Sequence, residues 1–435
     1  MERKPRETPP TAESVSTAWE SPKSLQFLGR WAILLRPLDS LLRYGSYRVL
    51  WASSFFTMGA TQMQLMARTW YIYELTGSPI AVGLVNLTFA IPLLLFSLYG
   101  GALADRIAKR SLMLFGAALM TIMGFGLAAI ISTGNIQPWH LVVASVFQGI
   151  VNAFQGPARQ AMVPELVERR FLLNAISLNA VQMNIARIGG PSIAGVLIGW
   201  VGIEAVFWLT GGMAALSFGL TVFLPAIKLA AQGPRRSVVG DMVQGLLYIK
   251  ERPVILHLLL ITFVVSSFGF PINFMLPIFA KDVLDVGPQG FGLLVSVIGL
   301  GALAGSLTMA SLGDIKRKGL LMLVISLIFG IGIILFTLSR DFYLSLAFLT
   351  LVGVGESGRM TVNNTLIQTH AEDHMRGRVL AVLQMERGLQ PLFLMPITLG
   401  AQFYGAPLAM GVSASVVVAY TLFVLLFQPS IRKLE

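Results

Sequence analysis

The sequence contains no cysteine, and only 12% of its 435 residues are charged. Without cysteine, the chain can form neither disulfides nor zinc sites with thiolate ligands. Its charged fraction is about half of the quarter that is usual in soluble domains. The charges that do occur fall in short gaps between long apolar stretches. This distribution excludes a soluble globular protein.

Apolar residues make up 55% of the chain, which is enough for about twelve spans of roughly 20 residues. In the first half, hydropathy places these spans near 49–73, 80–103, 111–132, 138–158, 173–199 and 203–226. In the second half, it places them near 254–279, 289–312, 319–338, 342–362, 377–402 and 406–428. We therefore predict an all-α membrane protein with twelve transmembrane helices.

The formal charge of +11 and the pI of 10.1 are typical of proteins that bind nucleic acid or a membrane surface. No folded basic surface is available here, so we expect no nucleic-acid partner. Of the 32 lysines and arginines, 27 fall on one side of the predicted spans and two on the other. This bias places both termini in the cytoplasm. The first 20 residues are polar, so no cleavable signal peptide is expected.

The two halves of the chain repeat each other. Adding 209 to the residue number takes Pro79 to Pro288 and Asp105 to Asp314. It also takes Leu-Met-Leu at 112–114 to the same triplet at 321–323, and an offset of 202 relates Gln-Met at 182–183 to 384–385. Such a parallel repeat indicates two related bundles of six helices.

These patterns divide the chain into five segments. A cytoplasmic tail at 1–47 contains either an interfacial helix over 25–42 or a loosely ordered lead-in to the first span. The two bundles occupy 48–226 and 254–428. A cytoplasmic linker at 227–253 joins them, and a short tail at 429–435 follows.

The loop after the second predicted span reads GALADRIAKR, residues 101–110. It resembles the signature loop between helices 2 and 3 of the major facilitator superfamily, although Ala108 replaces the usual glycine. The matching positions are Gly101, Asp105, Arg106, Lys109 and Arg110, with Asp314 in a degenerate second copy. The stretches YRVLWASSFFTMGATQM, GPARQAMVPELV and MRGRVLAV look most like the bacterial branch that contains enterobactin-type siderophore exporters and macrolide efflux proteins. The resemblance extends from Tyr47 to about Phe427.

This resemblance implies the major facilitator fold, with two pseudo-symmetric six-helix bundles, and a transporter rather than an enzyme. It also implies that the spans lie in the inner membrane of a bacterial cell. By resemblance, the signature loop is a gate that latches the cytoplasmic ends, with Asp105 near Arg376 and Asp314 near Asn174. The alternative is that its positive charges only set the topology. The Gly-Gly-Pro sequence at 189–191 is similar to the antiporter motif of this superfamily, or else it serves only helix packing.

Polar side chains at membrane depth are expected to face a cavity or one another, because lipid cannot satisfy their hydrogen bonds. Gln64 and Arg68 share one face of the first span, and Gln148, Asn152 and Gln155 share one face of the fourth. We predict that such residues line the substrate cavity, and the alternative is hydrogen bonding between helices. The full predicted set is Gln64, Arg68, Gln148, Asn152, Gln155, Gln182, Arg187, Asn273 and Gln384.

Two carboxylates are candidates for proton coupling, Glu386 first and Glu356 second, because a carboxylate whose neighbours change during transport can take up and release a proton. A static ion pair between Glu386 and Arg187 is the alternative. His370 and His374 lack a third metal ligand, and no phosphate-binding glycine loop occurs. We therefore expect no metal and no cofactor.

Together these features predict a secondary active transporter that works by alternating access. We expect a proton-coupled exporter of small amphipathic molecules such as drugs or siderophores. Its partners would be the small-molecule substrate, protons and the lipid bilayer, and we expect a monomer. Uptake or uncoupled facilitation of a small metabolite by the same fold is the first alternative. A membrane-embedded receptor or enzyme is the second.

Overall fold

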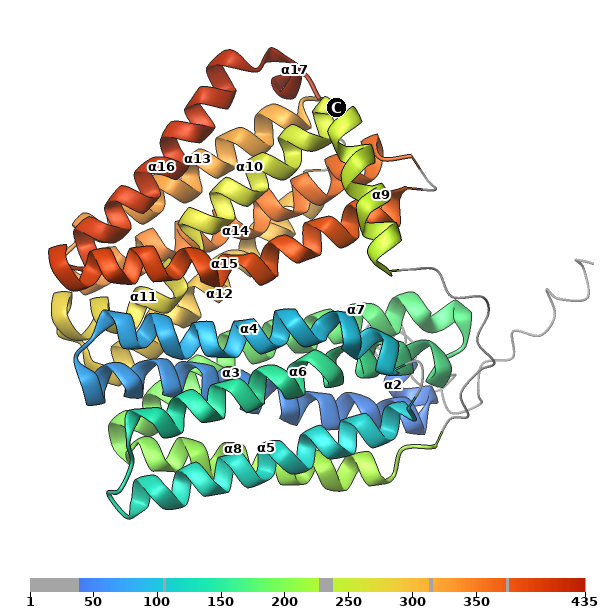
Figure 1. Cartoon of the computed structure of the whole chain (residues 1–435), viewed down its shortest axis with the longest axis vertical. Helices are drawn as coiled ribbons and strands as arrows, with labels where there is room; N and C mark the ends of the chain where they lie inside the picture. The colour runs from blue at the N-terminus through green and yellow to red at the C-terminus, as the bar shows by residue number, and fades with distance from the viewer. Residues whose placement is uncertain (1–38, 105–106, 227–237, 313–315, 373–374, 435) are drawn as a thin grey trace, which may run out of the picture.

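The computed structural model describes residues 39–104, 107–226, 238–312, 316–372 and 375–434. Within these ranges, side chains are not described at 97–104, 238–243, 310, 381, 384–389 and 391. The described part of the chain is almost entirely helical and contains no strand. Its helices pack side by side in two groups that follow each other along the sequence (Figure 1).

The first group contains six long helices. They are α3 (Gly45–Thr76), α4 (Pro79–Ala104), α5 (Lys109–Ser132), α6 (Pro138–Leu166), α7 (Leu172–Trp200) and α8 (Ile203–Val222), with the short α2 (Asp39–Arg43) and η3 (Arg169–Phe171). Proline begins both α4 and α6, where its missing N–H costs no helical hydrogen bond. Gly77, at φ 59°, ends α3 in the left-handed conformation that glycine adopts without strain.

The second group follows the same pattern with more interruptions. It comprises α9 (Val238–Glu251), α10 (Pro253–Gly269), α11 (Ile272–Ile278), the π-helix η4 (Phe279–Val283), α12 (Gly287–Ser311), α13 (Lys318–Leu338), α14 (Phe342–His370), α15 (Arg376–Tyr404), α16 (Ala406–Phe427) and α17 (Pro429–Arg432). The predicted bounds of 319–338 and 406–428 agree with α13 and α16 to within one residue.

Two elements differ from the sequence-based expectation. The span predicted as continuous over 254–279 is divided at Phe270 and Pro271, because proline has no N–H for the helical ladder. The carbonyl of Phe270 instead accepts a hydrogen bond from Asn273 Nδ2 at 3.1 Å. The predicted linker contains α9, which packs on α15 and buries Ile249. This tertiary contact stabilises a helix that hydropathy alone does not reveal.

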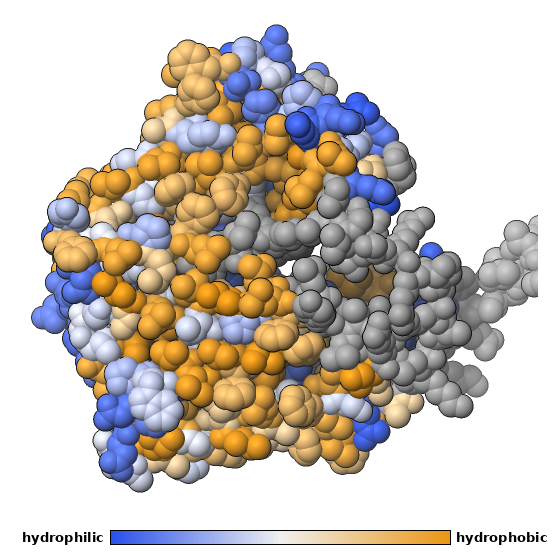
Figure 2. Space-filling view, viewed as in Figure 1, coloured by the Kyte–Doolittle hydropathy of each residue, from blue (hydrophilic) through white to orange (hydrophobic). Residues whose placement is uncertain are grey.

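Eight helical segments in the described ranges are long and apolar enough to cross a membrane. The long helices α3, α7, α14 and α15 are not among them, because charged and amide side chains such as Arg68, Arg187 and Glu356 make them less apolar. Figure 2 shows hydrophobic residues across the helix flanks and hydrophilic residues near the helix ends. An apolar belt between polar ends is the surface that a multi-pass membrane protein requires.

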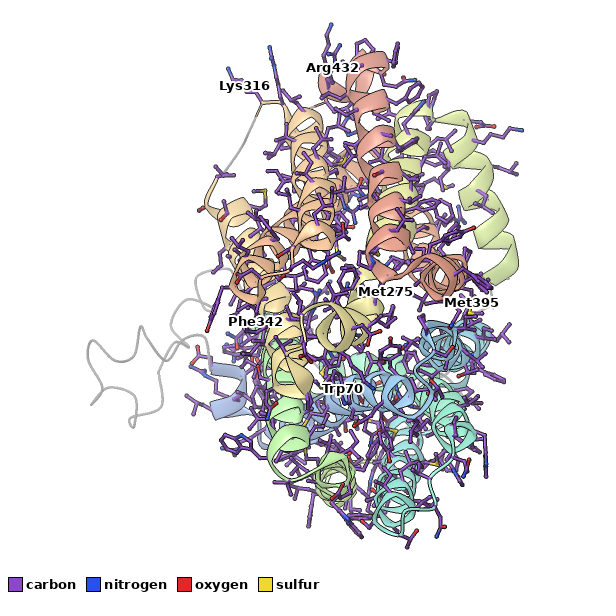
Figure 3. All side chains as sticks on the ribbon, turned by 90° about the vertical axis from the view of Figure 1, so that its left-hand side faces the viewer. Trp70, Met275, Lys316, Phe342, Met395 and Arg432 are labelled. Atoms are coloured by element: carbon purple, nitrogen blue, oxygen red, sulfur yellow. The ribbon has the colours of Figure 1, made fainter. Side chains whose placement is uncertain are left out.

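The two groups meet at one end of the molecule, where α3 ends and α12 begins. Trp70 stacks on Phe291 with ring centroids 5.5 Å apart, and Tyr73 donates a hydrogen bond from its hydroxyl to Asp282. Ser78 donates to Gln402 at 2.9 Å. Figure 3, seen from this end, places Trp70 and Met395 along the boundary between the groups. We call this the closed end.

Close helix crossings hold the closed end together. Helix α7 lies against α12, and α4 lies against α15. Ser296 of α12 donates a hydrogen bond to the carbonyl of Ile188 on α7 at 3.0 Å. From this end the two groups diverge towards the end that carries α2 and α9 (Figure 1). We call that the open end.

Candidate functional site

A cavity of about 600 Å³ lies between the two groups and is lined by both of them. Helices α3, α4 and α7 contribute from the first group, and α10 to α15 contribute from the second. Eight of the 27 lining residues are aromatic or sulfur-containing: Met66, Phe89, Met183, Phe270, Phe274, Phe291, Phe329 and Met360. Such side chains form an apolar wall that adapts to ligands of different shape.

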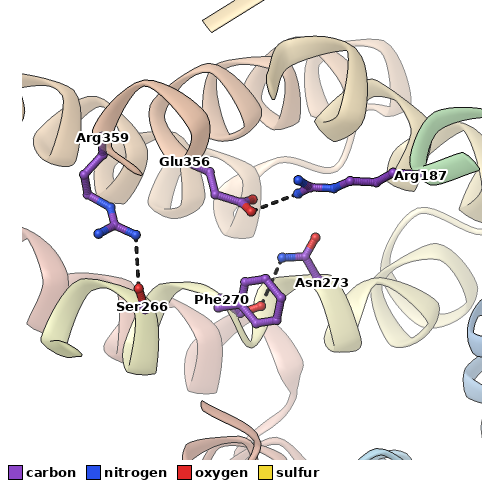
Figure 4. A network of polar contacts seen from close by, with 6 residues as sticks. All are labelled: Arg187, Ser266, Phe270, Asn273, Glu356 and Arg359. Carbon is purple, nitrogen blue, oxygen red and sulfur yellow. Dashed lines mark hydrogen bonds and ion pairs between the residues drawn. The ribbon is translucent and has the colours of Figure 1, made fainter. Parts of the chain in front are cut away.

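An ion pair crosses this cavity. Arg187 Nη2 on α7 donates to Glu356 Oε1 on α14 at 2.8 Å, so the two charges join the two groups (Figure 4). The Glu356 side chain is 14% exposed and that of Arg187 is 36% exposed. The second carboxylate oxygen, Glu356 Oε2, is buried and has no hydrogen-bond partner. A carboxylate that is only partly satisfied retains the capacity to accept a proton or a ligand donor.

Further polar groups surround this pair. Arg359, one turn from Glu356 on α14, donates a hydrogen bond from Nη2 to Ser266 Oγ at 3.1 Å. Asn363 also lines the cavity and is 2% exposed, and its Oδ1 has no hydrogen-bond partner. The site therefore combines an apolar wall with a small number of convergent polar groups. That combination is typical of binding sites for small amphipathic molecules.

The structure places two of the predicted cavity residues, Arg187 and Asn273, in the lining. Three others form a network inside the first group instead. Arg68 donates to Gln148 Oε1, and Gln148 Nε2 donates to Gln64 Oε1 at 3.3 Å. Gln64 Nε2 in turn donates to Thr210 on α8 at 3.1 Å. In this conformation the network joins α3, α6 and α8, which matches the alternative of hydrogen bonding between helices.

Three more predicted residues also contact neighbouring backbone rather than the cavity. Asn152 Nδ2 donates to the carbonyl of Gln148 at 2.9 Å, one turn earlier on α6. Gln155 Nε2 donates to the carbonyl of Met113 on α5 at 2.9 Å. Gln182 Nε2 donates to the carbonyl of Trp51 on α3 at 2.9 Å. The amides of Gln155 and Gln182 thereby join helices of the first group, whereas the Asn152 bond lies within α6.

The face of α3 that lines the cavity is adjacent to the predicted one. Its lining residues are Gln62, Leu65, Met66 and Thr69, which follow helical spacing. None of the four belongs to the predicted cavity set. Asn86 on α4, which was also missed, donates to the carbonyl of Val82 at 2.8 Å. Asn86 could have been predicted from the sequence, because it is a polar residue within an otherwise apolar span.

Of the two proton-coupling candidates, Glu356 has a described side chain and Glu386 does not. Glu356 lies in the cavity wall and pairs with Arg187, the residue that the sequence analysis paired with Glu386 as an alternative. The side chains of Glu386 and Gln384 lie outside the described residues.

The predicted gate is described only in part. Asp105, Arg106 and Asp314 lie outside the described residues, and Gly101 lies in the last turn of α4. At the start of α5, Lys109 forms an ion pair with Glu165, and Arg110 Nη2 donates to the carbonyl of Val222 at 2.6 Å.

The predicted partners of the two gate carboxylates have contacts of their own. Arg376 Nε donates to the carbonyl of Gln368 at 3.1 Å. Asn174 Oδ1 accepts a hydrogen bond from the backbone N–H of Ser40 in α2 at 3.1 Å. The latch itself therefore stays a prediction.

Comparison with protein families identifies this architecture. The family described as transmembrane secretion effector, a branch of the major facilitator superfamily, matches residues 38–428. The chain belongs to the major facilitator superfamily. This major facilitator protein is therefore a multi-pass membrane transporter, as its relatives are, and the sequence-based recognition is confirmed.

Curated relatives of this major facilitator protein are transporters of small molecules. The staphyloferrin A transporter of Staphylococcus aureus is 23% identical, with 82% of this chain and 90% of that protein covered. The multidrug efflux pump Tap of Mycolicibacterium fortuitum is 25% identical, with 73% and 80% covered. Macrolide efflux protein A of Streptococcus pyogenes is 21% identical, with 77% and 84% covered.

Solved structures show the same fold at low sequence identity. The nucleoside transporter NupG superimposes with a TM-score of 0.71 at 12% identity, covering 88% of this chain and all of the other. A transporter of the POT family superimposes with a TM-score of 0.72 at 14% identity, covering 89% and 96%. The helical architecture is thus shared with major facilitator proteins whose sequences have diverged widely.

Proposed function

We propose that this chain exports small amphipathic molecules in exchange for protons, by alternating access of the central cavity. The observation that carries this proposal is the cavity between the two groups, crossed by the Arg187–Glu356 ion pair. In the proposed architecture, twelve membrane-crossing helices form two six-helix bundles, at 48–226 and 254–428. The efflux proteins among the relatives support the direction of transport.

The charge distribution supports the proposed orientation. With both termini in the cytoplasm of a bacterial cell, the open end faces the cytoplasm and the closed end faces outwards. The described conformation would then be inward-facing, with the cavity reached from the cytoplasm. An exporter must take up its cargo in this conformation.

The ion pair supplies a mechanism for coupling. When Glu356 is ionised, its attraction to Arg187 links the two bundles at the cavity. Uptake of one proton by the carboxylate removes this attraction and leaves Arg187 without its counter-charge inside the protein. The link therefore weakens upon protonation, and the bundles can separate at the cavity. One proton moving through 100 mV supplies about 2.3 kcal/mol, enough for a concentration ratio of roughly fiftyfold.

The test is transport into proteoliposomes or inside-out vesicles with an imposed proton gradient. Erythromycin and tetraphenylphosphonium serve as probes of different chemistry. We expect the wild-type chain to accumulate at least one probe when the vesicle interior is acidic, and a protonophore to abolish the accumulation. The Glu356→Gln variant should lose gradient-driven accumulation, because an amide cannot exchange a proton.

Two controls make this outcome specific. Glu204→Gln, at the start of α8 and outside the cavity lining, should transport normally. Glu386→Gln tests the other candidate in the same assay. Probe uptake that persists after the gradient collapses, without accumulation above the external concentration, would reject proton coupling and favour uncoupled facilitation. Full gradient-driven transport by Glu356→Gln would remove this residue from the mechanism.

A further inference from the structure

A second cavity, of about 580 Å³, lies along α14 towards the open end. It is lined by Thr361, Asn364, Thr365, Gln368, Thr369 and Arg376. Asn364 lines both this cavity and the central one, so the two adjoin each other at this residue. We call the five α14 residues from Thr361 to Thr369 the polar track.

The polar track has an unusual composition for a helix surface. Four of its residues, all but Asn364, are exposed, whereas Leu366 and Ile367 between them are fully buried. The segment 361–369 contains no charged residue, unlike an ordinary solvated helix face. The amides of Asn364 and Gln368 would cost free energy if they faced lipid, so this side of α14 faces water or a ligand.

Hydrogen bonding within α14 determines what the track offers. Thr361, Thr365 and Thr369 each donate to the backbone carbonyl four residues earlier, at 2.9–3.0 Å. Their hydroxyl protons are therefore committed, and their lone pairs remain free to accept. The guanidinium of Arg376, whose Nε donates to the carbonyl of Gln368, lies at the outer end of the track.

A further acceptor lies where the track reaches the central cavity. Asn363, next to Asn364 in sequence, is 2% exposed, lines the central cavity and has an Oδ1 without a hydrogen-bond partner. An unsatisfied buried acceptor costs free energy that a ligand donor would recover. The route from the open end to the cavity thus presents successive acceptors.

We infer that the polar track is a vestibule subsite that binds the hydroxyl- and amide-bearing part of an amphipathic ligand before it enters the central cavity. Neutral hydrogen-bond donors match the acceptors of the track. The apolar part of the same ligand fits the aromatic and methionine wall beyond Asn364. This inference rests on the proposed export function, since it assigns the polar track to the same cargo.

The chain contains no cysteine, so a single introduced thiol reports on one position. In inside-out vesicles, we expect a membrane-impermeant maleimide to label Thr365→Cys. Erythromycin, which carries several hydroxyls, should slow the labelling about tenfold at ten times its Kd, because the free fraction falls as 1/(1 + [L]/Kd). Tetraphenylphosphonium, which has no hydrogen-bond donor, should leave the rate unchanged. Thr350→Cys, on the same helix outside both cavity linings, should not be labelled.

A second experiment removes two hydroxyl acceptors of the polar track by valine substitution, which keeps the shape of the side chains. The double variant Thr361→Val/Thr365→Val should raise the KM for erythromycin about tenfold, since each hydrogen bond contributes roughly 0.5–1.5 kcal/mol. The matched control is Thr350→Val, because Thr350 makes the same kind of bond to the carbonyl of Leu346 at 2.8 Å. The control should leave the KM unchanged.

The outcomes separate this inference from the proposed function. Erythromycin could protect the thiol of the Thr365→Cys variant in vesicles that transport neither probe. That result would support the vestibule and reject export of these probes. Transport without protection would overturn the vestibule and leave export intact. An unreactive thiol at Thr365, or equal protection by tetraphenylphosphonium, would also overturn the vestibule.

Discussion

The closed end depends on two glycines that face each other across α7 and α12. A Cβ added at Gly195 would lie 2.7 Å from the carbonyl oxygen of Pro288 and 2.9 Å from Gly292 Cα. A Cβ added at Gly292 would lie 2.8 Å from the carbonyl oxygen of Pro191. Ordinary contact begins at 3.4 Å. Either alanine substitution therefore requires the helices to separate by roughly half an ångström at their crossing.

This separation has a cost that can be estimated. Overpacking a close contact costs about 1–3 kcal/mol. The penalty applies only while α7 and α12 are in contact, so it raises the free energy of the closed-end conformation alone. A shift of about 1–3 kcal/mol changes the ratio of two conformations by roughly 5- to 150-fold. Gly195→Ala and Gly292→Ala should thus each populate a conformation in which the closed end has separated.

Double electron–electron resonance measures this change directly. Spin labels attached at Asn135→Cys and Tyr404→Cys, two exposed residues at the closed end, report the distance between the two groups. We expect both alanine variants to gain a population at longer distance. Gly189→Ala is the matched control on α7, because its added Cβ would meet no atom within 4 Å. Distance distributions equal to the wild type in both variants would refute the steric reasoning.

Two further predictions concern side-chain hydrogen bonds, one at the closed end and one within the first group. Tyr73→Phe removes the hydroxyl that donates to Asp282. The variant should separate the closed end in the same resonance assay, with a free-energy change of about 1.5–3 kcal/mol between the two conformations. An unchanged distance distribution would show that this bond does not hold the end closed. Arg68→Met leaves Gln148 Oε1 without its donor, and it should lower the free energy of unfolding by about 1–3 kcal/mol while leaving the KM for the probes unchanged. A changed KM with unaltered stability would instead place Arg68 in the transport pathway.

The sequence predicted the long helices well where apolar runs are bounded by prolines, glycines or charges. The prediction of 173–199 differs from α7 by one residue at each end, and that of 138–158 has the observed start at Pro138. The break at Phe270 and Pro271 was missed, although Pro271 was a visible signal. Prolines within α6 and α7 do not divide those helices, so a proline alone does not predict where a helix breaks.

Within the site, sequence reasoning found the charges but not their partners. Arg187 and Glu356 were both recognised as charges within predicted spans, yet 169 residues separate them along the chain. Their pairing depends on how α7 faces α14. The stripe of Gln64 and Arg68 was recognised correctly as one helical face. Whether that face meets the cavity or α6 and α8 is determined by rotation of α3 within its group.

The amino-acid sequence by itself determined that this chain is a helical membrane protein, because the number and length of apolar runs follow from composition alone. It also determined the family, because the signature loop and the repeat are local patterns. Only the tertiary structure decided which polar groups meet in the cavity and which bind neighbouring helices. Helical periodicity specifies a face, but packing against other helices specifies what that face contacts.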